Sequence, residues 1–292
     1  MNPSPIWIFR LLWLVLPFLT APLFGDALAE TASPFRIGAT VLLYAGWAAV
    51  LVGSMVPRTQ TLTLTRVIAP MAFVAAIWAS LSGNLDEDPL LSVVLGLISS
   101  GAAAVAALSG VNGDAFVDGS SYGDETRFLL RTPSALLLGP IQFVWLGIAA
   151  GAIAGPLLLL AERWILGGIA LVVGWALAFF AVPVLHRLSD RWLVFVPAGV
   201  VVHDKTALRE PQLFRKEQIE AFGPAPNDSE LEDLSLNGLG LALRAKLIEP
   251  SKVIRNQRSE SVDVTEIAGF IVSPNRPAAV VSEAKERGFA IG

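Results

Sequence analysis

Acidic side chains gather in one polar stretch of the chain, residues 111–131 (VNGDAFVDGSSYGDETRFLLR). They are Asp114, Asp118, Asp124 and Glu125. Carboxylate oxygens are the ligands that Ca²⁺ prefers, so a calcium loop is the first chemistry to consider. The four acids lack the alternating ligand spacing and the closing glutamate of an EF-hand, and we therefore expect no metal site in this stretch.

Nucleophilic and phosphate-binding chemistry are also poorly supported. The hydroxyl groups of Ser120, Ser121 and Tyr122 have no histidine or lysine beside them to activate them. The glycines do not form a GxxxxGK[ST] phosphate loop. The chain has no cysteine and only two histidines, His186 and His203, which excludes disulfides, thiolate sites and a multi-histidine metal site within one chain. We expect no catalytic residue, metal or cofactor.

Apolar side chains in the same stretch suggest a different role. Phe116, Val117, Tyr122 and Phe128 can be buried only if the stretch docks against another part of the protein. We predict a docking loop on the C-terminal domain, with these candidate residues: Phe116, Asp118, Tyr122, Asp124 and Phe128. A loop that binds a partner or ligand is the alternative.

A second candidate surface is a strip of basic residues in LALRAKLIEPSKVIRNQR, residues 241–258. On an alternating strand Arg244 and Lys246 share one face and Leu243 and Leu247 the other. The strip comprises Arg244, Lys246, Lys252, Arg255 and Arg258. Membrane lipids with anionic headgroups would attract it. The alternative is that it faces the acidic segment 228–233. Nucleic-acid binding is not expected, because no aromatic platform alternates with the charges.

The composition indicates a membrane protein. Hydrophobic residues make up 54% of the chain and charged residues 16%, whereas soluble domains average about 25% charged. The net charge of −4 is too small to imply a strongly charged partner. Apolar blocks occupy residues 1–187, interrupted by a loop at 109–133, and ordinary polar sequence occupies 188–292. We therefore predict two domains divided there.

Six apolar segments approach the length of roughly 20 residues that a membrane-spanning helix needs. They are Ile6–Phe24, Ile37–Val56, Val67–Leu81, Leu90–Leu108, Ala135–Leu160 and Ile165–Leu185. The sequence Ala27-Leu28-Ala29 resembles a signal-peptidase site, so a cleaved first segment is the alternative to a retained helix, which we favour.

Basic residues in short loops predict the orientation, because they stay on the cytoplasmic side. With the N-terminus inside, seven arginines flank the inner ends of the segments and only Arg36 and Arg163 flank the outer ends. The N-terminus, the loop 109–133 and the C-terminal domain are then all cytoplasmic.

The predicted spans contain few polar groups. No Asp, Glu, Lys or His lies deep in any of them. Ion carriers normally keep ionisable groups there, which argues against ion transport. Small residues recur instead, at Ser99–Ala104 and as Gly147, Gly151 and Gly155 at four-residue spacing. Such ridges allow close helix packing, within the bundle or against a partner helix.

The C-terminal region reads as a small α+β domain. Leu193–Asp204 is typical of a hairpin turning at Pro197-Ala198-Gly199. Further strands are expected at Pro211–Phe214, Gln218–Phe222, Leu239–Ile248, Lys252–Arg255 and Ala268–Ser273, followed by a helix over Ala278–Arg287.

The segments DRWLVFVPAGVVVHD, REPQLFRKEQIEAF and GFIVSPNRPAAVVSEAKERG together resemble the PH-like domain that many prokaryotic membrane proteins carry beside their spans. The membrane half, with its loop DGSSYGDE at residues 118–125, resembles multi-pass proteins of actinobacteria. The first resemblance implies an open sheet barrel capped by a helix, a bacterial plasma-membrane location, and a binding or scaffolding role without catalysis.

We predict an α-helical bundle of six spans followed by a small α+β PH-like domain, acting as a non-enzymatic scaffold or assembly partner of a membrane complex. Its expected partners are membrane lipids and another membrane protein, and nucleic acid is not expected. A transporter of a neutral or lipidic molecule, which needs a cavity, and an intramembrane enzyme, which needs paired polar residues at one depth, are the alternatives.

Overall fold

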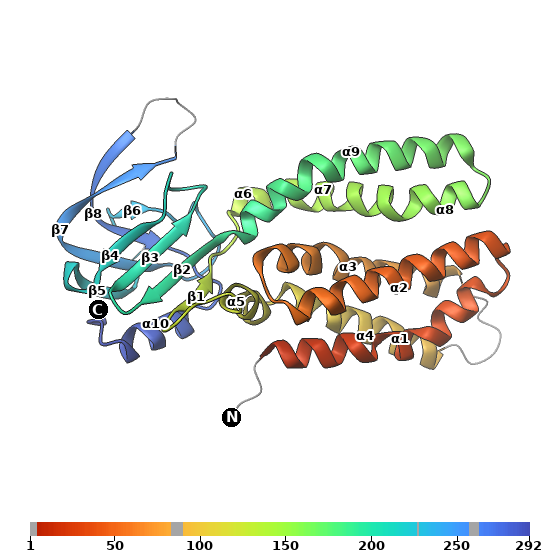
Figure 1. Ribbon diagram of the computed structural model, residues 1–292, viewed down its shortest axis with the longest axis horizontal. Coiled ribbons are helices and arrows are strands. Elements are labelled where there is room, and N and C mark those ends of the chain that lie inside the picture. Colours follow the sequence, from red (N-terminus) through yellow and green to blue (C-terminus); the bar gives the residue numbers. More distant parts are fainter. Residues whose placement is uncertain (1–4, 83–89, 227, 257–262) are drawn as a thin grey trace. The chain divides into compact units, whose positions relative to one another are not determined.

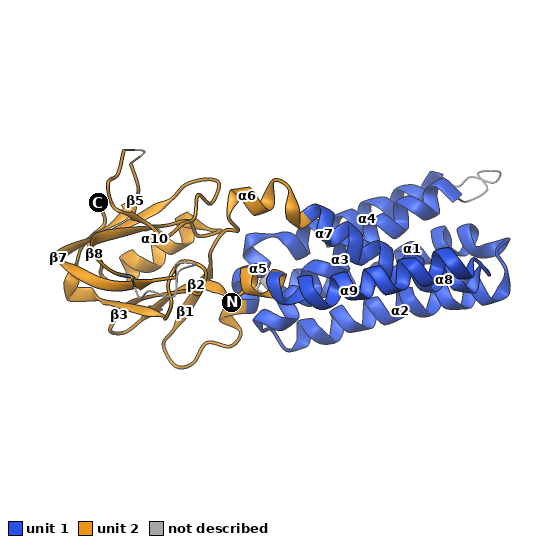
Figure 2. Ribbon diagram, turned by 90° about the horizontal axis from the view of Figure 1, so that it is seen from above, with its two compact units in different colours: residues 1–116, 142–184 blue, residues 117–141, 185–292 orange. Residues whose placement is uncertain are grey.

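The computed structural model describes residues 5–82, 90–226, 228–256 and 263–292. The chain forms two compact units (Figure 2). The first contains residues 1–116 and 142–184, and the second contains residues 117–141 and 185–292. The second unit therefore includes a segment that the sequence analysis had assigned to a loop of the membrane domain.

Six helices in the first unit are long and apolar enough to cross a membrane. The first four are α1 (Pro5–Ala29), α2 (Ser33–Met55), α3 (Thr59–Ser82) and α4 (Leu90–Leu108) (Figure 1). The fifth consists of α7 (Pro140–Ala149), the π-helical turn Ala150–Ala154 and α8 (Gly155–Leu160), and the sixth is α9 (Trp164–Ser189). Each corresponds to one predicted segment. Two short helices, α5 (Gly110–Asp118) and α6 (Ser134–Leu137), lie between α4 and α7.

Helices α1 to α4 share a core in which large and small side chains interlock. Its buried members are Phe9, Trp13, Leu16, Val50, Ala69, Ala103 and Ala107. The indole N–H of Trp13 donates to the carbonyl of Trp47 (2.9 Å) and that of Trp47 donates to the carbonyl of Trp13 (2.8 Å). Arg10 donates to the carbonyl of Ser54 at the end of α2. Three of the seven buried members, Phe9, Trp13 and Leu16, belong to α1, and a retained first helix stays a prediction.

The fifth and sixth helices pack through glycine, as the four-residue spacing predicted. A Cβ on Gly151 would collide with the backbone of Gly174 in α9, and one on Gly155 would collide with the backbone of Leu171. The ridge is therefore used within the chain, where it brings two backbones into close contact.

The second unit contains two sheets and a helix. One sheet has the order β1-β2-β3-β4, with β1 (Thr126–Leu129), β2 (Arg191–Val196), β3 (Gly199–Asp204) and β4 (Gln212–Arg215). The other has the order β5-β7-β8-β6, with β5 (Ile219–Pro224), β7 (Leu243–Arg255), β8 (Asp263–Val272) and β6 (Glu232–Asp233). Helix α10 (Pro277–Glu286) follows. Both sheets and α10 contribute to one apolar core, which includes Phe195, Phe214, Phe222, Phe270 and Val280.

Strands β2 to β5 agree with the sequence expectation, whereas β1 and β6 were not expected, β8 begins five residues before the expected Ala268, and β7 differs in its extent. Leu239–Ile248 and Lys252–Arg255 were expected as separate strands, but Leu243–Arg255 is one strand whose pairing with β8 shifts between Lys246 and Ser251. Pro250 lies in that irregular region and has no N–H for the ladder, so the chain absorbs it in a bulge and does not end the strand. The predicted hairpin is present as β2 and β3, with Gly199 at φ 152°.

Strand β1 comes from the segment that precedes the last two long helices, which the sequence did not predict. This strand pairs antiparallel with β2, although α7, α8 and α9 lie between them in the sequence. The helix pair 140–189 is thus an insertion between two adjacent strands of one sheet (Figure 1). Adjacent strands must lie on the same side of a membrane, which holds if the inserted helices cross it twice.

Candidate functional site

The candidate site is built on residues 117–133, which we call the strap. Its centre is β1, paired with β2 in the register Phe128↔Leu193 and Leu129↔Trp192. Phe128 alternates to the core side, is 6% exposed, and meets Phe195 edge to face with ring centroids 5.9 Å apart. The strap therefore supplies an edge strand and an aromatic core residue to the second unit.

Beyond β1, backbone hydrogen bonds continue to hold the strap. The N–H of Leu130 donates to the carbonyl of Arg191 (2.9 Å), and the N–H of Arg131 donates to the carbonyl of Ser273 (2.7 Å). The Arg131 guanidinium donates to the carbonyls of Leu239 and Pro274. The strap thus contacts β2 and the segment just after β8, and these bonds position the chain where it enters the inserted helix pair.

A buried ion pair lies where the chain returns from the helix pair. Arg191 and Asp204 have 1% and 0% of their side chains exposed, and Nη2 of Arg191 lies 2.7 Å from Oδ2 of Asp204. Arg191 Nε also donates to this oxygen (2.8 Å), and Nη1 donates to the carbonyl of Arg131 (2.9 Å). We call Arg131, Arg191 and Asp204 the clamp. It joins the last residues of the strap to the first residue of β2.

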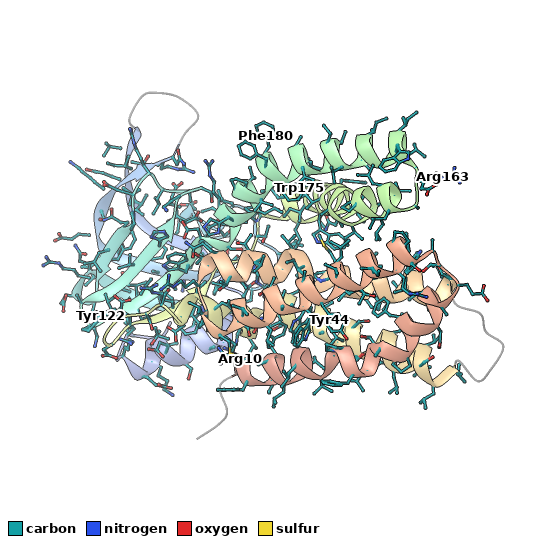
Figure 3. The ribbon with its side chains drawn as sticks, turned by 45° about the vertical axis from the view of Figure 1, so that its right-hand side comes forward. Arg10, Tyr44, Tyr122, Arg163, Trp175 and Phe180 are labelled. Carbon is teal, nitrogen blue, oxygen red and sulfur yellow. The ribbon has the colours of Figure 1, made fainter. Side chains whose placement is uncertain are left out.

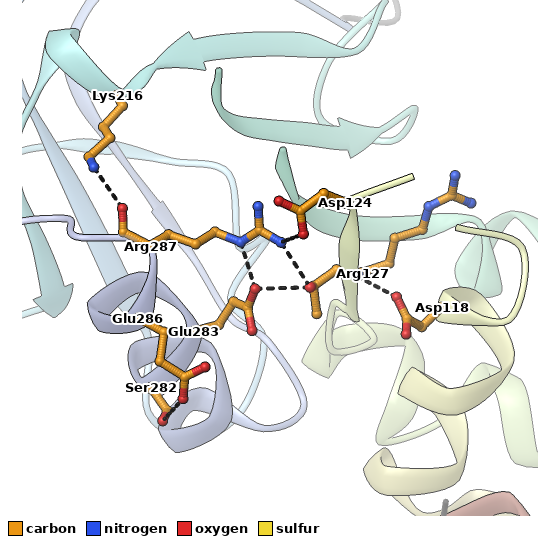
Figure 4. Close-up of polar contacts among 9 residues, drawn as sticks. Asp118, Asp124, Arg127, Lys216, Ser282, Glu283, Glu286 and Arg287 are labelled. Atoms are coloured by element: carbon orange, nitrogen blue, oxygen red, sulfur yellow. Dashed lines mark hydrogen bonds and ion pairs between the residues drawn. The ribbon is translucent and has the colours of Figure 1, made fainter. Parts of the chain in front are cut away.

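A polar network joins the part of the strap around the start of β1 to the end of α10 (Figure 4). The hydroxyl of Thr126 donates to Glu283 Oε1 (2.9 Å), and Arg287 Nε donates to the same oxygen (2.6 Å). Arg287 Nη2 lies 3.4 Å from Asp124 Oδ1. The N–H of Arg127 donates to Asp118 Oδ1 (2.9 Å), which closes the turn before β1.

An aromatic stack lies across β2 and β3. The rings of Trp192 and His203 are stacked, with centroids 4.3 Å apart and an interplanar angle of 1°. The Arg127 guanidinium carbon lies 5.9 Å from the Trp192 ring centroid. Burial lowers the pKa of His203, while Asp190, whose Oδ2 lies 3.8 Å from Nε2, acts in the opposite direction. The imidazole is therefore held neutral near pH 7, as part of a stack.

The predicted docking residues have different positions. Phe128, Asp118 and Asp124 make the contacts given above. Phe116 is buried, but it belongs to the first unit and not to the C-terminal unit. Tyr122, which Figure 3 labels, lies in the turn between α5 and β1 and is 87% exposed. Its expected role as an apolar anchor is wrong.

The basic strip is largely neutralised by neighbouring acids. Lys246 pairs with Glu220 (2.9 Å), Lys252 with Glu266 (3.6 Å) and Arg255 with Glu232 (2.5 Å). Only Glu232 belongs to the acidic segment that the sequence suggested. Arg244 Nε is buried and lacks a hydrogen-bond partner among the described residues, and Arg258 lies outside them. These pairs weaken the attraction of the strip for anionic lipids.

Sequence reasoning missed an interaction between two charges in the first unit, the partly buried Arg66 and the buried Asp114. Arg66 was counted among the arginines that flank the inner span ends, and Asp114 was placed in the loop 109–133, where no metal site was expected. Instead Arg66 lies in α3 and interacts electrostatically with Asp114 of α5, which is 5% exposed. Nothing in the local pattern marks this pair, because the two residues are brought together only when α5 folds.

The strap supplies backbone and side-chain contacts to the second unit. Across the described ranges, no group of three or more His, Asp or Glu side chains could hold a metal ion. Arg191 is paired with Asp204 and Arg287 with Glu283, while the Arg131 guanidinium is bonded to backbone carbonyls. No family model matches the chain, and no curated protein or solved structure matches it.

Proposed function

We propose that the chain is a non-enzymatic integral membrane scaffold, which holds its second unit beside a membrane to bind and position a partner membrane protein. The observation that carries the proposal is the insertion of the helix pair between β1 and β2. The second unit is joined to the helices by three chain connections, where a simple C-terminal domain would have one. Three connections restrain a domain more than a single linker does, and a restrained binding surface suits a scaffold.

Two further features support a protein partner over lipid as the main contact. The basic strip is paired with Glu220, Glu232 and Glu266, so little net positive charge remains to attract headgroups. The second unit also exposes apolar side chains on β7 and β8, among them Ile248 (62%) and Val264 (52%). The second unit has two sheets and a terminal helix, and we propose that this arrangement is a PH-like fold.

The scaffold proposal is tested by photocrosslinking in intact cells. A photoreactive amino acid at Ile248 or Val264, followed by purification under denaturing conditions, should trap a discrete membrane protein. Phe180 in α9 is the matched control, because it is 72% exposed on an apolar helix and should give lipid adducts. Absence of any protein adduct from the second unit, together with movement of a neutral solute by purified protein in liposomes, would replace the scaffold with a transporter.

We also propose that the second unit is cytoplasmic in the bacterial plasma membrane, as the arginine distribution favours. Reporter fusions placed after residue 84 and after residue 292 should report opposite sides of the membrane. Reporters on the same side would show that the proposed threading is wrong.

A further inference from the structure

The last residues of the chain lie along a sheet edge of the second unit. Strand β5 is the outermost strand of its sheet, and residues 289–292, the tail segment, run beside it. The N–H of Phe222 donates to the carbonyl of Ala290 (2.8 Å), and the N–H of Gly292 donates to the carbonyl of Phe222 (3.3 Å). Phe222 and Ile291 form a parallel bridge. The tail segment thus contacts the β5 edge as an added strand would.

One side chain anchors this segment. Phe289 is 6% exposed, and its ring centroid lies 5.7 Å from that of Phe195 and 6.3 Å from that of Phe222. The ammonium of Lys216 lies 5.8 Å from the same ring centroid. Ala290, Ile291 and Gly292 are exposed. The segment is therefore held by an aromatic side chain and two backbone hydrogen bonds.

The backbone and side chains of the β5 edge limit which extended segments can pair with it. Gly223 leaves room for the carbonyl of Gly292, because a Cβ at position 223 would collide with that oxygen. A Cβ at position 292 would lie 3.2 Å from the Cβ of Ala221, which is tight. Pro224 follows and has no N–H to extend the ladder. The edge accepts an extended segment in one register, with an aromatic residue at the position of Phe289 and a small residue three positions later.

We propose that the β5 edge is a binding site for an extended segment of a partner protein with this pattern, and that the tail segment occupies it in cis. The inference rests on the proposed scaffold function and specifies its partner. A tethered segment competes at an effective concentration in the millimolar range, so a partner must displace it. A partner segment must replace two backbone hydrogen bonds to the edge and the buried Phe289 ring, and an extended segment with an aromatic residue at that position can supply both.

The test uses the full chain in detergent micelles and a fluorescein-labelled peptide, GFAIG, followed by fluorescence anisotropy. In Phe289→Ala the anchor of the tail is gone and its pocket is vacant, so the peptide should bind at least about tenfold more tightly than to the unmodified chain. Adding Gly223→Ala to this variant should abolish binding, because the new Cβ blocks the register. A peptide with alanine for phenylalanine, GAAIG, should not bind.

Stability is monitored in the same samples, because Phe289→Ala leaves a cavity. The GFAIG peptide should raise the unfolding temperature of Phe289→Ala and leave that of the double variant unchanged. If Phe289→Ala does not fold, hydrogen exchange in the unmodified chain decides the question. The Phe222 amide should exchange much faster than the amides that pair β7 with β8, and equally slow exchange would refute an exchangeable tail.

A folded Phe289→Ala variant that binds the peptide no better than the unmodified chain would overturn the proposal. If photocrosslinking at Ile248 or Val264 still traps a membrane protein in that case, the β5 edge is wrong and the scaffold function stands. If the peptide binds as expected but no protein is trapped, the edge site stands and the scaffold function fails.

Discussion

Two segments add to the sheet edges of the second unit, and they are held in different ways. Strand β1 lies on one sheet in an antiparallel ladder, with Phe128 in the core and the clamp and the α10 network around it. The tail segment lies on the other sheet with two backbone hydrogen bonds and Phe289. The Arg191–Asp204 pair of the clamp is buried and costly to separate, whereas the tail segment has no such pair among the described residues and depends on Phe289 and two backbone bonds. We therefore infer that β1 is a permanent part of its sheet and that the tail segment is exchangeable.

The largest effect is expected from breaking the clamp. Asp204→Ala leaves the Arg191 guanidinium buried without its carboxylate, which should destabilise the second unit by about 3–5 kcal/mol. The double variant Arg191→Met/Asp204→Leu removes both charges and should lose much less. Hydrogen exchange of the amides in β2 and β3 measures the free energy of opening of the second unit in each variant. A double variant as unstable as Asp204→Ala would show that packing, not the unpaired charge, sets the cost.

Substitution of the two aromatic residues of the strap, Phe128 and Tyr122, should have very different effects on stability. Phe128→Ser removes a core ring, and we expect a loss of about 3–5 kcal/mol and rapid proteolysis of the strap. Tyr122→Ser changes a residue that is 87% exposed, and it should leave the proteolysis rate within the error of the unmodified chain. Faster cleavage in Tyr122→Ser would mean that the turn before β1 docks in a way that its exposure does not indicate.

A smaller effect is expected from the α10 network. Glu283→Ala removes the acceptor shared by Thr126 and Arg287 and should cost about 1–2 kcal/mol, measured as faster exchange of the β1 amides. Glu286→Ala is the matched control, because Glu286 lies on an exposed part of the same helix. Equal exchange rates in the two variants would show that the network does not stabilise the pairing of β1.

The smallest effect should come from His203. Its pKa is lowered by burial in the folded state, so the unfolded chain binds more protons near the ordinary value of 6.5. The stability of the second unit should therefore decline as the pH falls below about 6.5, with Asp190, Asp204 and Lys205 modulating the shift. His203→Phe keeps the stack on Trp192 but cannot titrate, and its stability should be less dependent on pH. An unchanged pH profile in this variant would contradict the assignment.

The sequence predicted the elements better than their connections. Apolar length alone located six helices, and alternation located most strands, because both signals are local. Strand β1 was missed because four residues, Thr126–Leu129, carry too little pattern to distinguish a strand from a loop. The docking of Phe128 was anticipated from its apolar character, whereas Tyr122 shows that an aromatic residue in a turn need not be buried.

The clamp could not be predicted from the sequence. Arg191 looked like a flanking arginine and Asp204 like the end of a hairpin, and only the β2–β3 register places them opposite each other. The tail segment was missed for the same reason, because pairing with β5 depends on where α10 ends and not on local propensity.

The inserted helix pair has a consequence for biosynthesis. β1 leaves the ribosome before its neighbour in the sheet exists, since Arg191 follows Leu129 by roughly 60 residues. At about 5–20 residues per second, the nascent strand waits roughly 3–12 s while both intervening helices are translated and inserted. Correct insertion of the last two helices is thus a prerequisite for completing the sheet. A chain arrested between them would expose an unpaired strand, which could pair with another chain.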